Sequence, residues 1–131
     1  MADVAEVRLS ADPSSASSAR EFVRVHLLSH GLGHLVEDVR LVVSELATNA
    51  VRHAGCRFTV VLEVSDHAVL LSVADSSPTV PVRRLVDPWE GGGRGLALVE
   101  GLSSRWGVDA TTRSKTVWAS FARDGRERVP E

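Results

Sequence analysis

The chain has 131 residues, is 44% hydrophobic and 24% charged, and carries a formal net charge of −2 at pH 7, which favours a single globular domain over residues 1–131. The weak negative charge argues against direct binding to nucleic acid, and the lack of an apolar run of ~20 residues argues against a membrane span. One cysteine, Cys56, excludes an internal disulfide and, with an acidic N-terminus that lacks a signal-peptide pattern, leads us to expect a cytoplasmic protein.

The first half of the chain predicts one strand followed by two helices. Apolar and polar residues alternate over 4–9, as is typical of a strand. Asp12 and Pro13 match an N-cap and a first helical position, and the helix that they start is expected to extend to about residue 29. After a Gly-Leu-Gly break, apolar residues recur every three or four positions, which predicts a helix over about 34–54.

The second half predicts two hairpins separated by a loop and a helix. Alternation over 58–64 and an apolar run over 68–74 predict the first hairpin. Prolines and glycines fill residues 75–95, and a loop of this length is typically a lid or a binding loop. A helix and a closing strand pair are expected over 96–104, 106–112 and 116–122, with a turn at 113–115. This order predicts an α+β two-layer sandwich, with a mixed, mostly antiparallel sheet and helices on one face.

One helical turn separates Glu45 from Asn49, the only asparagine in a chain without glutamine. Residues four apart lie on the same face of a helix, so the carboxylate and the carboxamide stack there. Mg²⁺ prefers oxygen ligands and needs few protein contacts beside phosphate and water. Asn49 can supply one such contact, and Glu45 can take a proton from a hydroxyl or position a water. The alternative is that both belong to the solvent-exposed face of an amphipathic helix.

Two further features can complete a nucleotide site. Asp75 ends a predicted strand, where its carboxylate can accept a hydrogen bond from an amine such as that of adenine; alternatively, it only opens a turn. The Gly-rich segment 91–95 leads into a helix, and backbone amides at a helix start bind anions such as phosphate. Arg94 can add a charge-assisted contact, although a flexible linker explains the segment equally well. The segment matches neither a P-loop nor a dinucleotide fingerprint.

These motifs resemble those of a known group of ATPases. Three of them follow the order of the gyrase, chaperone, histidine-kinase and mismatch-repair ATPase superfamily: Glu45-x-x-x-Asn49, Asp75 and Gly93-x-Gly95-Leu96. Bacterial anti-sigma factor serine/threonine kinases, especially the short actinobacterial ones, are similar to this chain at four segments: 44–54, 92–99, 106–108 and 116–118. The resemblance covers about 19–122 and implies a Bergerat-type ATP-binding fold.

The resemblance also implies which residues meet the nucleotide. ATP would lie between helices and sheet, with Asn49 binding Mg²⁺, Glu45 acting as the catalytic base and Asp75 reading the adenine amine. The phosphates would meet Gly93, Arg94 and Gly95. The other positions expected to contact the nucleotide are Arg52, His53, Pro81, Gly92, Leu96 and Thr116.

By the same analogy, the chain is a Mg-ATP-dependent protein serine/threonine kinase and anti-sigma factor. It would phosphorylate a serine on an anti-anti-sigma (STAS-type) partner, sequester a sigma factor when free, and commonly form a homodimer. One departure matters, because the family usually carries glycines two and four residues after the aspartate, where this chain has Ser77 and Thr79. The alternative is a non-catalytic ATP-binding module whose occupancy controls a partner.

Overall fold

A computed structural model describes residues 2–54, 57–75, 92–111 and 114–124 of the chain. The elements in these ranges are β1 (Asp3–Leu9), α1 (Ser15–Ser29), a 3₁₀ turn η1 (Gly33–Leu35), α2 (Val36–Asn49), a π-helical turn η2 (Ala50–Ala54), β2 (Phe58–Val64), β3 (Ala68–Asp75), α4 (Gly92–Leu102), β4 (Arg105–Ala110) and β5 (Lys115–Ala122). The strands form one sheet in the order β1-β2-β3-β5-β4. All four pairings are antiparallel, so the expected mostly antiparallel sheet is antiparallel throughout its described strands.

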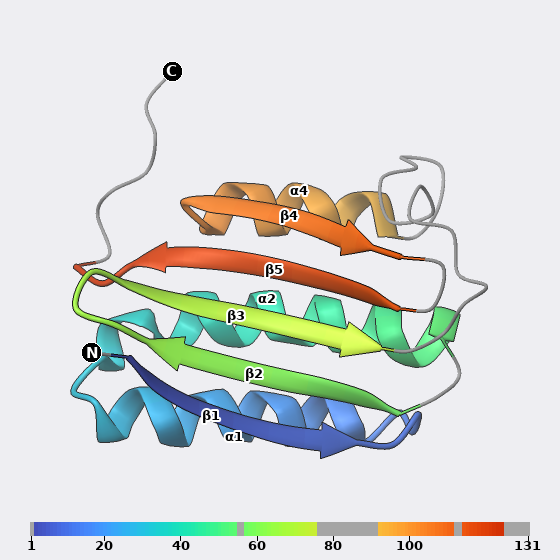
Figure 1. Ribbon diagram of the computed structural model, residues 1–131, viewed down its shortest axis with the longest axis horizontal. Helices are drawn as coiled ribbons and strands as arrows, with labels where there is room; N and C mark the ends of the chain where they lie inside the picture. The colour runs from blue at the N-terminus through green and yellow to red at the C-terminus, as the bar shows by residue number, and fades with distance from the viewer. Residues whose placement is uncertain (1, 55–56, 76–91, 112–113, 125–131) are drawn as a thin grey trace.

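The predicted two-layer α+β architecture is confirmed, with α1, α2 and α4 on one face of the sheet (Figure 1). Strand alternation explains the layering, because side chains along β2, β3 and β5 are alternately buried and half-buried. The buried side chains meet the apolar faces of α1 and α2 in one core. Its largest fully buried side chains include Phe58, Leu62 and Leu71 from the sheet, and Leu27 and Val43 from the helices.

Helix α1 begins two residues later than the sequence predicts. The Asp12 carboxylate accepts hydrogen bonds from the backbone N–H of Ser14 (2.9 Å) and from its hydroxyl (3.0 Å). These bonds lower the pKa of the Asp12 carboxyl and hold residues 12–14 in a turn that precedes the helix. The expectation that Asp12 caps a helix with Pro13 as its first residue is therefore wrong. The predicted end is confirmed: Gly31, at φ +71°, forms a Schellman motif with Leu32 donating to the Leu27 carbonyl at 2.9 Å.

The boundaries of three later elements also differ from the predictions. The long helix expected over 34–54 is divided into η1, α2 and η2, with its π turn directly after Asn49. Helix α4 starts at Gly92 instead of residue 96, so the glycine segment forms its first turn. Strand β5 starts at Lys115, which the sequence places in a turn, because Lys115 pairs with Asp75 on one side and with Ala110 on the other. The remainder of the predicted loop, 76–91, lies outside the described residues.

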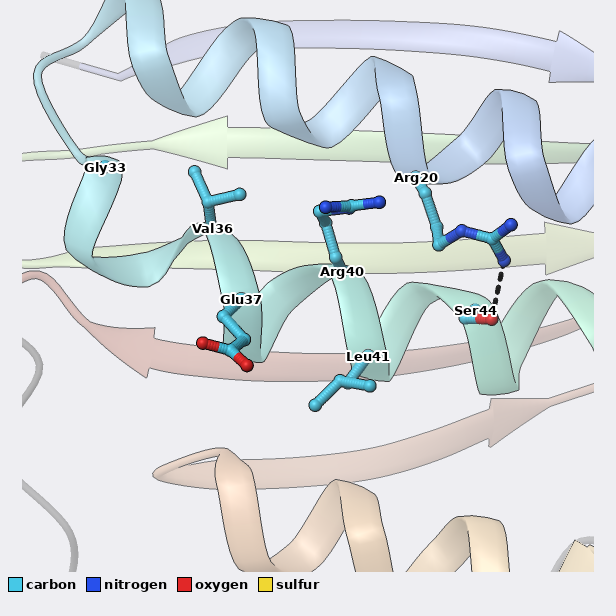
Figure 2. A pocket seen from close by; sticks show the side chains of 7 residues that line it. All are labelled: Arg20, Gly33, Val36, Glu37, Arg40, Leu41 and Ser44. Carbon is cyan, nitrogen blue, oxygen red and sulfur yellow. Dashed lines mark hydrogen bonds between the residues drawn. The ribbon is translucent and has the colours of Figure 1, made fainter.

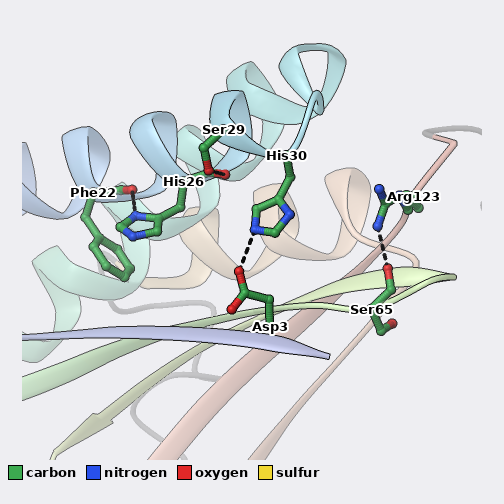
Figure 3. Close-up of polar contacts among 7 residues, drawn as sticks. All are labelled: Asp3, Phe22, His26, Ser29, His30, Ser65 and Arg123. Carbon is green, nitrogen blue, oxygen red and sulfur yellow. Dashed lines mark hydrogen bonds and ion pairs between the residues drawn. The ribbon is translucent and has the colours of Figure 1, made fainter. Parts of the chain in front are cut away.

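Polar contacts tie the layers together at the end of the sheet away from Asp75 (Figure 3). His30, after α1, lies 2.8 Å from the carboxylate of Asp3 at the start of β1. Arg123, after β5, donates a 2.7 Å hydrogen bond to the carbonyl of Ser65 in the β2–β3 turn. His34 in turn contacts the Arg123 carbonyl at 2.7 Å. These contacts fix one end of the molecule, and Asn49 and Asp75 lie at the other.

We expect Gly107→Ala to destabilise the protein by about 1–3 kcal/mol through overpacking. Gly107 faces Trp118 on the neighbouring strand, and a Cβ at position 107 would lie 2.6 Å from the indole Cζ2. Urea unfolding of the purified protein would measure the loss. Gly101→Ala is the matched control, because a Cβ there meets nothing within 4 Å and alanine is the better helix former. Equal midpoints for the two variants would contradict the prediction.

Candidate functional site

Four chain segments meet at one end of the molecule. The end of α2, the end of β3, the start of β5 and the start of α4 all lie on the right in Figure 1. The antiparallel register places Asp75, the last residue of β3, directly opposite Lys115, the first of β5. Helix α2 contacts β3, β5 and α4. Residues far apart in the sequence are thereby brought together, as the motif order predicts.

Asn49 and Asp75 line the same cavity. Both are 5% exposed, so neither points into bulk solvent. The cavity is lined by Leu46, Asn49, Ala50, Val73, Asp75, Lys115 and Val117. Its volume is about 10 Å³, enough for roughly one water molecule. A ligand larger than a water molecule would therefore lie at the mouth of this cavity or displace these side chains.

A buried ion pair occupies one wall of this cavity. The Nζ atom of Lys115 lies 3.8 Å from Oδ2 of Asp75, and their side chains are 5% and 2% exposed. Lysine is almost never buried unless it is paired, because desolvating an ammonium is costly. Lys115 belongs to none of the sequence motifs described above. One feature of the sequence could have drawn attention to this residue, because Lys115 is the only lysine among fifteen basic residues.

The neighbouring Thr116, expected to contact the nucleotide, is not brought to the cavity. Successive side chains of a strand point to opposite faces, and in β5 Lys115 and Val117 are buried beneath the helices while Thr116 is half-buried. Thr116 therefore lies on the opposite face of the sheet from the cavity, and its contact with the nucleotide stays a prediction. Arg52, in η2, has an exposed side chain and does not line the cavity either.

Glu45 lies one turn before Asn49 on α2 and is half-buried. Its neighbour Ser44 is held from the other helix, because Arg20 of α1 donates a 3.0 Å hydrogen bond to the Ser44 hydroxyl. Figure 2 shows this bond at one side of a groove of about 620 Å³ between α1 and α2. The groove is lined by Arg20, Gly33, Val36, Glu37, Arg40, Leu41 and Ser44. It is separate from the cavity at Asn49 and shares no lining residue with it.

The first turn of α4 carries the predicted phosphate-binding segment. Gly92, Gly93, Arg94 and Gly95 lie in it, followed by Leu96. The first four N–H groups of an α-helix have no partner within the helix, and they carry the positive end of its dipole. Their placement at the Asp75 end of the molecule is what a phosphate-binding role requires. Pro81 lies outside the described residues. His53 lies in η2, where only its backbone is described.

The oxygen donors present fit a magnesium ion that arrives with its nucleotide. Among the described ranges, no group of three or more His, Cys, Asp or Glu side chains could hold a metal ion. Mg²⁺, however, usually takes only one or two protein oxygens and completes its shell with phosphate and water. The buried carboxamide of Asn49 can supply one such oxygen. The π turn that follows Asn49 is also a feature found frequently at functional sites.

Comparison with known proteins identifies the family. The model of the histidine kinase-like ATPase domain family matches residues 9–121 of the chain. The chain belongs to this family. It therefore contains an ATP-binding domain of a type that typically binds ATP together with Mg²⁺. The motifs at Glu45, Asn49, Asp75 and 92–96 all fall within the matched range.

A solved structure supports the fold assignment. The crystal structure of the RsbU and RsbW domains of Rv1364c from Mycobacterium tuberculosis matches with a TM-score of 0.70 at 22% sequence identity. The match covers 91% of this chain and 32% of that one, so the present chain corresponds to about a third of the larger protein. No curated protein matches the sequence significantly. Within the described residues, none of the helices has the length and apolar character of a bilayer-spanning segment.

We expect Asp75→Asn to destabilise the protein by about 3–5 kcal/mol, the range for removing one charge of a buried pair. The substitution leaves the Lys115 ammonium in the interior without the carboxylate charge beside it. Chemical unfolding would measure the loss. Asp109→Asn, at an exposed position of β4, is the control and should change stability by no more than about 0.5 kcal/mol. A loss at Asp75 no larger than at Asp109 would show that the ion pair contributes little.

Proposed function

We propose that this protein is a Mg-ATP-dependent protein serine/threonine kinase that acts on a serine of an anti-anti-sigma (STAS-type) partner and restrains a sigma factor. The observation that carries the proposal is the meeting of Asn49 and Asp75 in one cavity, one helical turn from Glu45. In this proposal, binding of Mg-ATP requires the Asn49 carboxamide and the Asp75 carboxylate, whereas phosphate transfer also requires a base. The family match supports the nucleotide, and the likeness to an RsbW-containing structure supports the partner class.

Each residue has a distinct task in this proposal. Bound Mg-ATP would supply the phosphoryl group and neutralise charge as it is transferred. Asn49 would hold the metal through its carboxamide oxygen, and Asp75 would accept a hydrogen bond from the adenine amine. The backbone amides at the start of α4 face the phosphates. Glu45 would accept the proton that the partner's serine hydroxyl loses as its oxygen attacks the γ-phosphorus of ATP, while the bond from that phosphorus to the β–γ bridging oxygen breaks and ADP leaves.

The location and assembly of the protein follow from the same proposal. A kinase that controls a sigma factor works in the cytoplasm, where transcription takes place. A homodimer would give one sigma factor two copies of the binding surface. Both statements rest on the partner class and can be tested separately, by fractionation and by measurement of molecular mass in solution.

Glu45→Gln should lower phosphate transfer to the partner by roughly 10²–10⁴-fold, the usual contribution of a positioned general base. Nucleotide binding should be almost unchanged, since the amide has the same shape as the carboxylate. Radiolabelled ATP incubated with the cognate partner would report transfer, and calorimetry would report binding. Glu37→Gln, at an exposed position on the same helix, is the control and should retain full transfer. Undiminished labelling by the Glu45 variant would remove this residue from the chemistry.

Asn49→Ala should weaken Mg-ATP binding by at least about tenfold, because one protein oxygen on the metal is lost. The binding that remains should depend less on magnesium than binding by the original protein. Titration with ATP in the presence of Mg²⁺ and of a chelator would measure both effects. A variant with the same affinity and the same magnesium dependence would place the metal elsewhere.

A second function, a non-catalytic ATP-binding switch, is favoured by one feature of the sequence. Ser77 and Thr79 replace the glycines that the anti-sigma kinases usually carry after the aspartate. Larger residues keep the backbone further from the base and can alter the geometry that transfer requires. Tight Mg-ATP binding with no phosphate transferred to any candidate partner would support the switch over the kinase.

A further inference from the structure

Lys115 has no task in the proposed phosphate transfer, yet its ion pair with Asp75 lies where the adenine base is expected. Asp75 and Lys115 are opposite one another in the β3–β5 ladder, and both side chains enter the cavity that Asn49 lines. Their charged atoms are 3.8 Å apart, which is an ion-pair distance longer than a direct hydrogen bond of ~2.7–3.2 Å. The wall therefore presents one acceptor and one donor side by side.

Most of the other side chains of the cavity cannot bind a polar ligand edge, so this pair largely decides which edge fits. Leu46, Ala50, Val73 and Val117 are apolar and cannot satisfy a polar atom on the edge of a base. Apart from Asn49, the polar side chains that line the cavity within the described part of the chain are the Asp75 carboxylate and the Lys115 ammonium. A ligand edge that places a donor at Asp75 and an acceptor at Lys115 is complementary to both charged groups.

We propose that Lys115 is a specificity-determining residue that donates to N1 of adenine while Asp75 accepts from the N6 amine. The inference rests on the proposed nucleotide site and adds a second contact to the base. N6 and N1 are adjacent on the adenine ring, as the two charged groups are adjacent on the wall. Each side chain then meets a group of complementary polarity, and neither contact involves the phosphates or the metal.

The same pair excludes guanine in the same orientation. Guanine carries a carbonyl oxygen at C6 and a hydrogen on N1. Its oxygen would face the Asp75 carboxylate, and its N1–H would face the Lys115 ammonium. Both contacts become repulsive, whereas a site with Asp75 alone would suffer only one mismatch. Lys115 therefore doubles the number of positions at which the site distinguishes the two purines.

Nucleotide analogues test this inference on the unaltered protein, so that no variant has to fold. 1-Deaza-ATP has a C–H group in place of N1, and it should bind roughly tenfold to a hundredfold more weakly than ATP, the usual effect of losing a hydrogen bond to a charged group. 7-Deaza-ATP is the matched control, since it changes the opposite edge of the base and should bind about as tightly as ATP. Calorimetric titrations with Mg²⁺ present would give the three affinities.

A Lys115→Met variant then ties the effect to the residue. Methionine has similar length and no charge, so the variant should bind ATP at least as weakly as the unaltered protein binds 1-deaza-ATP. It should show no further loss with 1-deaza-ATP, because both changes remove the same contact. The ratio of its affinity for ATP to its affinity for GTP should also fall by about tenfold or more. Lys115→Arg, which retains a charged donor, should restore part of the discrimination, and thermal unfolding would confirm that each variant is folded.

The outcomes separate this inference from the proposed function. Equal affinities for ATP and 1-deaza-ATP would overturn the role of Lys115 and leave the kinase proposal intact. Independent, additive losses from the Lys115→Met variant and the 1-deaza analogue would overturn it as well. If the unaltered protein binds no adenine nucleotide at all, the proposed function itself fails.

Discussion

The register of β3 against β5 is the constraint on which the candidate site depends. It sets Asp75 opposite Lys115 and turns both side chains toward the helices. A slip of one residue in either strand would turn one of these charges to the open face and leave the other buried alone. The core prevents such a slip, because Val69, Leu71 and Val73 of β3 would be exposed together with Asp75. The hydrophobic pattern that builds the sheet thus also fixes the polar end of the site.

Hydrophobic packing in the helix layer positions Asn49 in the same way. The apolar face of α2 packs on β3 and β5, and Asn49 lies at the end of that face beside Leu46 and Ala50. Its carboxamide is therefore buried as a consequence of the packing that buries its apolar neighbours. At the opposite end of the sheet, polar contacts such as that between His30 and Asp3 join the layers. One end of the molecule is closed by these contacts, while the other carries the groups of the site.

The sequence predicts those features that are local. The i, i+4 spacing of Glu45 and Asn49 and the strand-end position of Asp75 require only helical and strand periodicity, and the element order follows from the same patterns. Lys115 could not be found in this way, because its burial depends on pairing with a strand forty residues earlier. The resemblance named Thr116 without saying which face of the sheet it occupies, and the alternation of β5 places its side chain on the opposite face from Lys115. At Asp12, a local turn competes with the helix start, and propensity alone does not decide between them.

A buried ion pair contributes little to stability compared with apolar residues of similar volume, because desolvation offsets the attraction between the charges. In the proposed site, the pair is explained instead by what it would present to the base. An isolated carboxylate at this position would also repel the negative charge of a triphosphate through a weakly screening interior. With Lys115 beside it, Asp75 belongs to a pair of zero net charge and can still accept a hydrogen bond. Base recognition and phosphate binding are then compatible within one small domain, because the carboxylate acts at short range and contributes little repulsion at the distance of the phosphates.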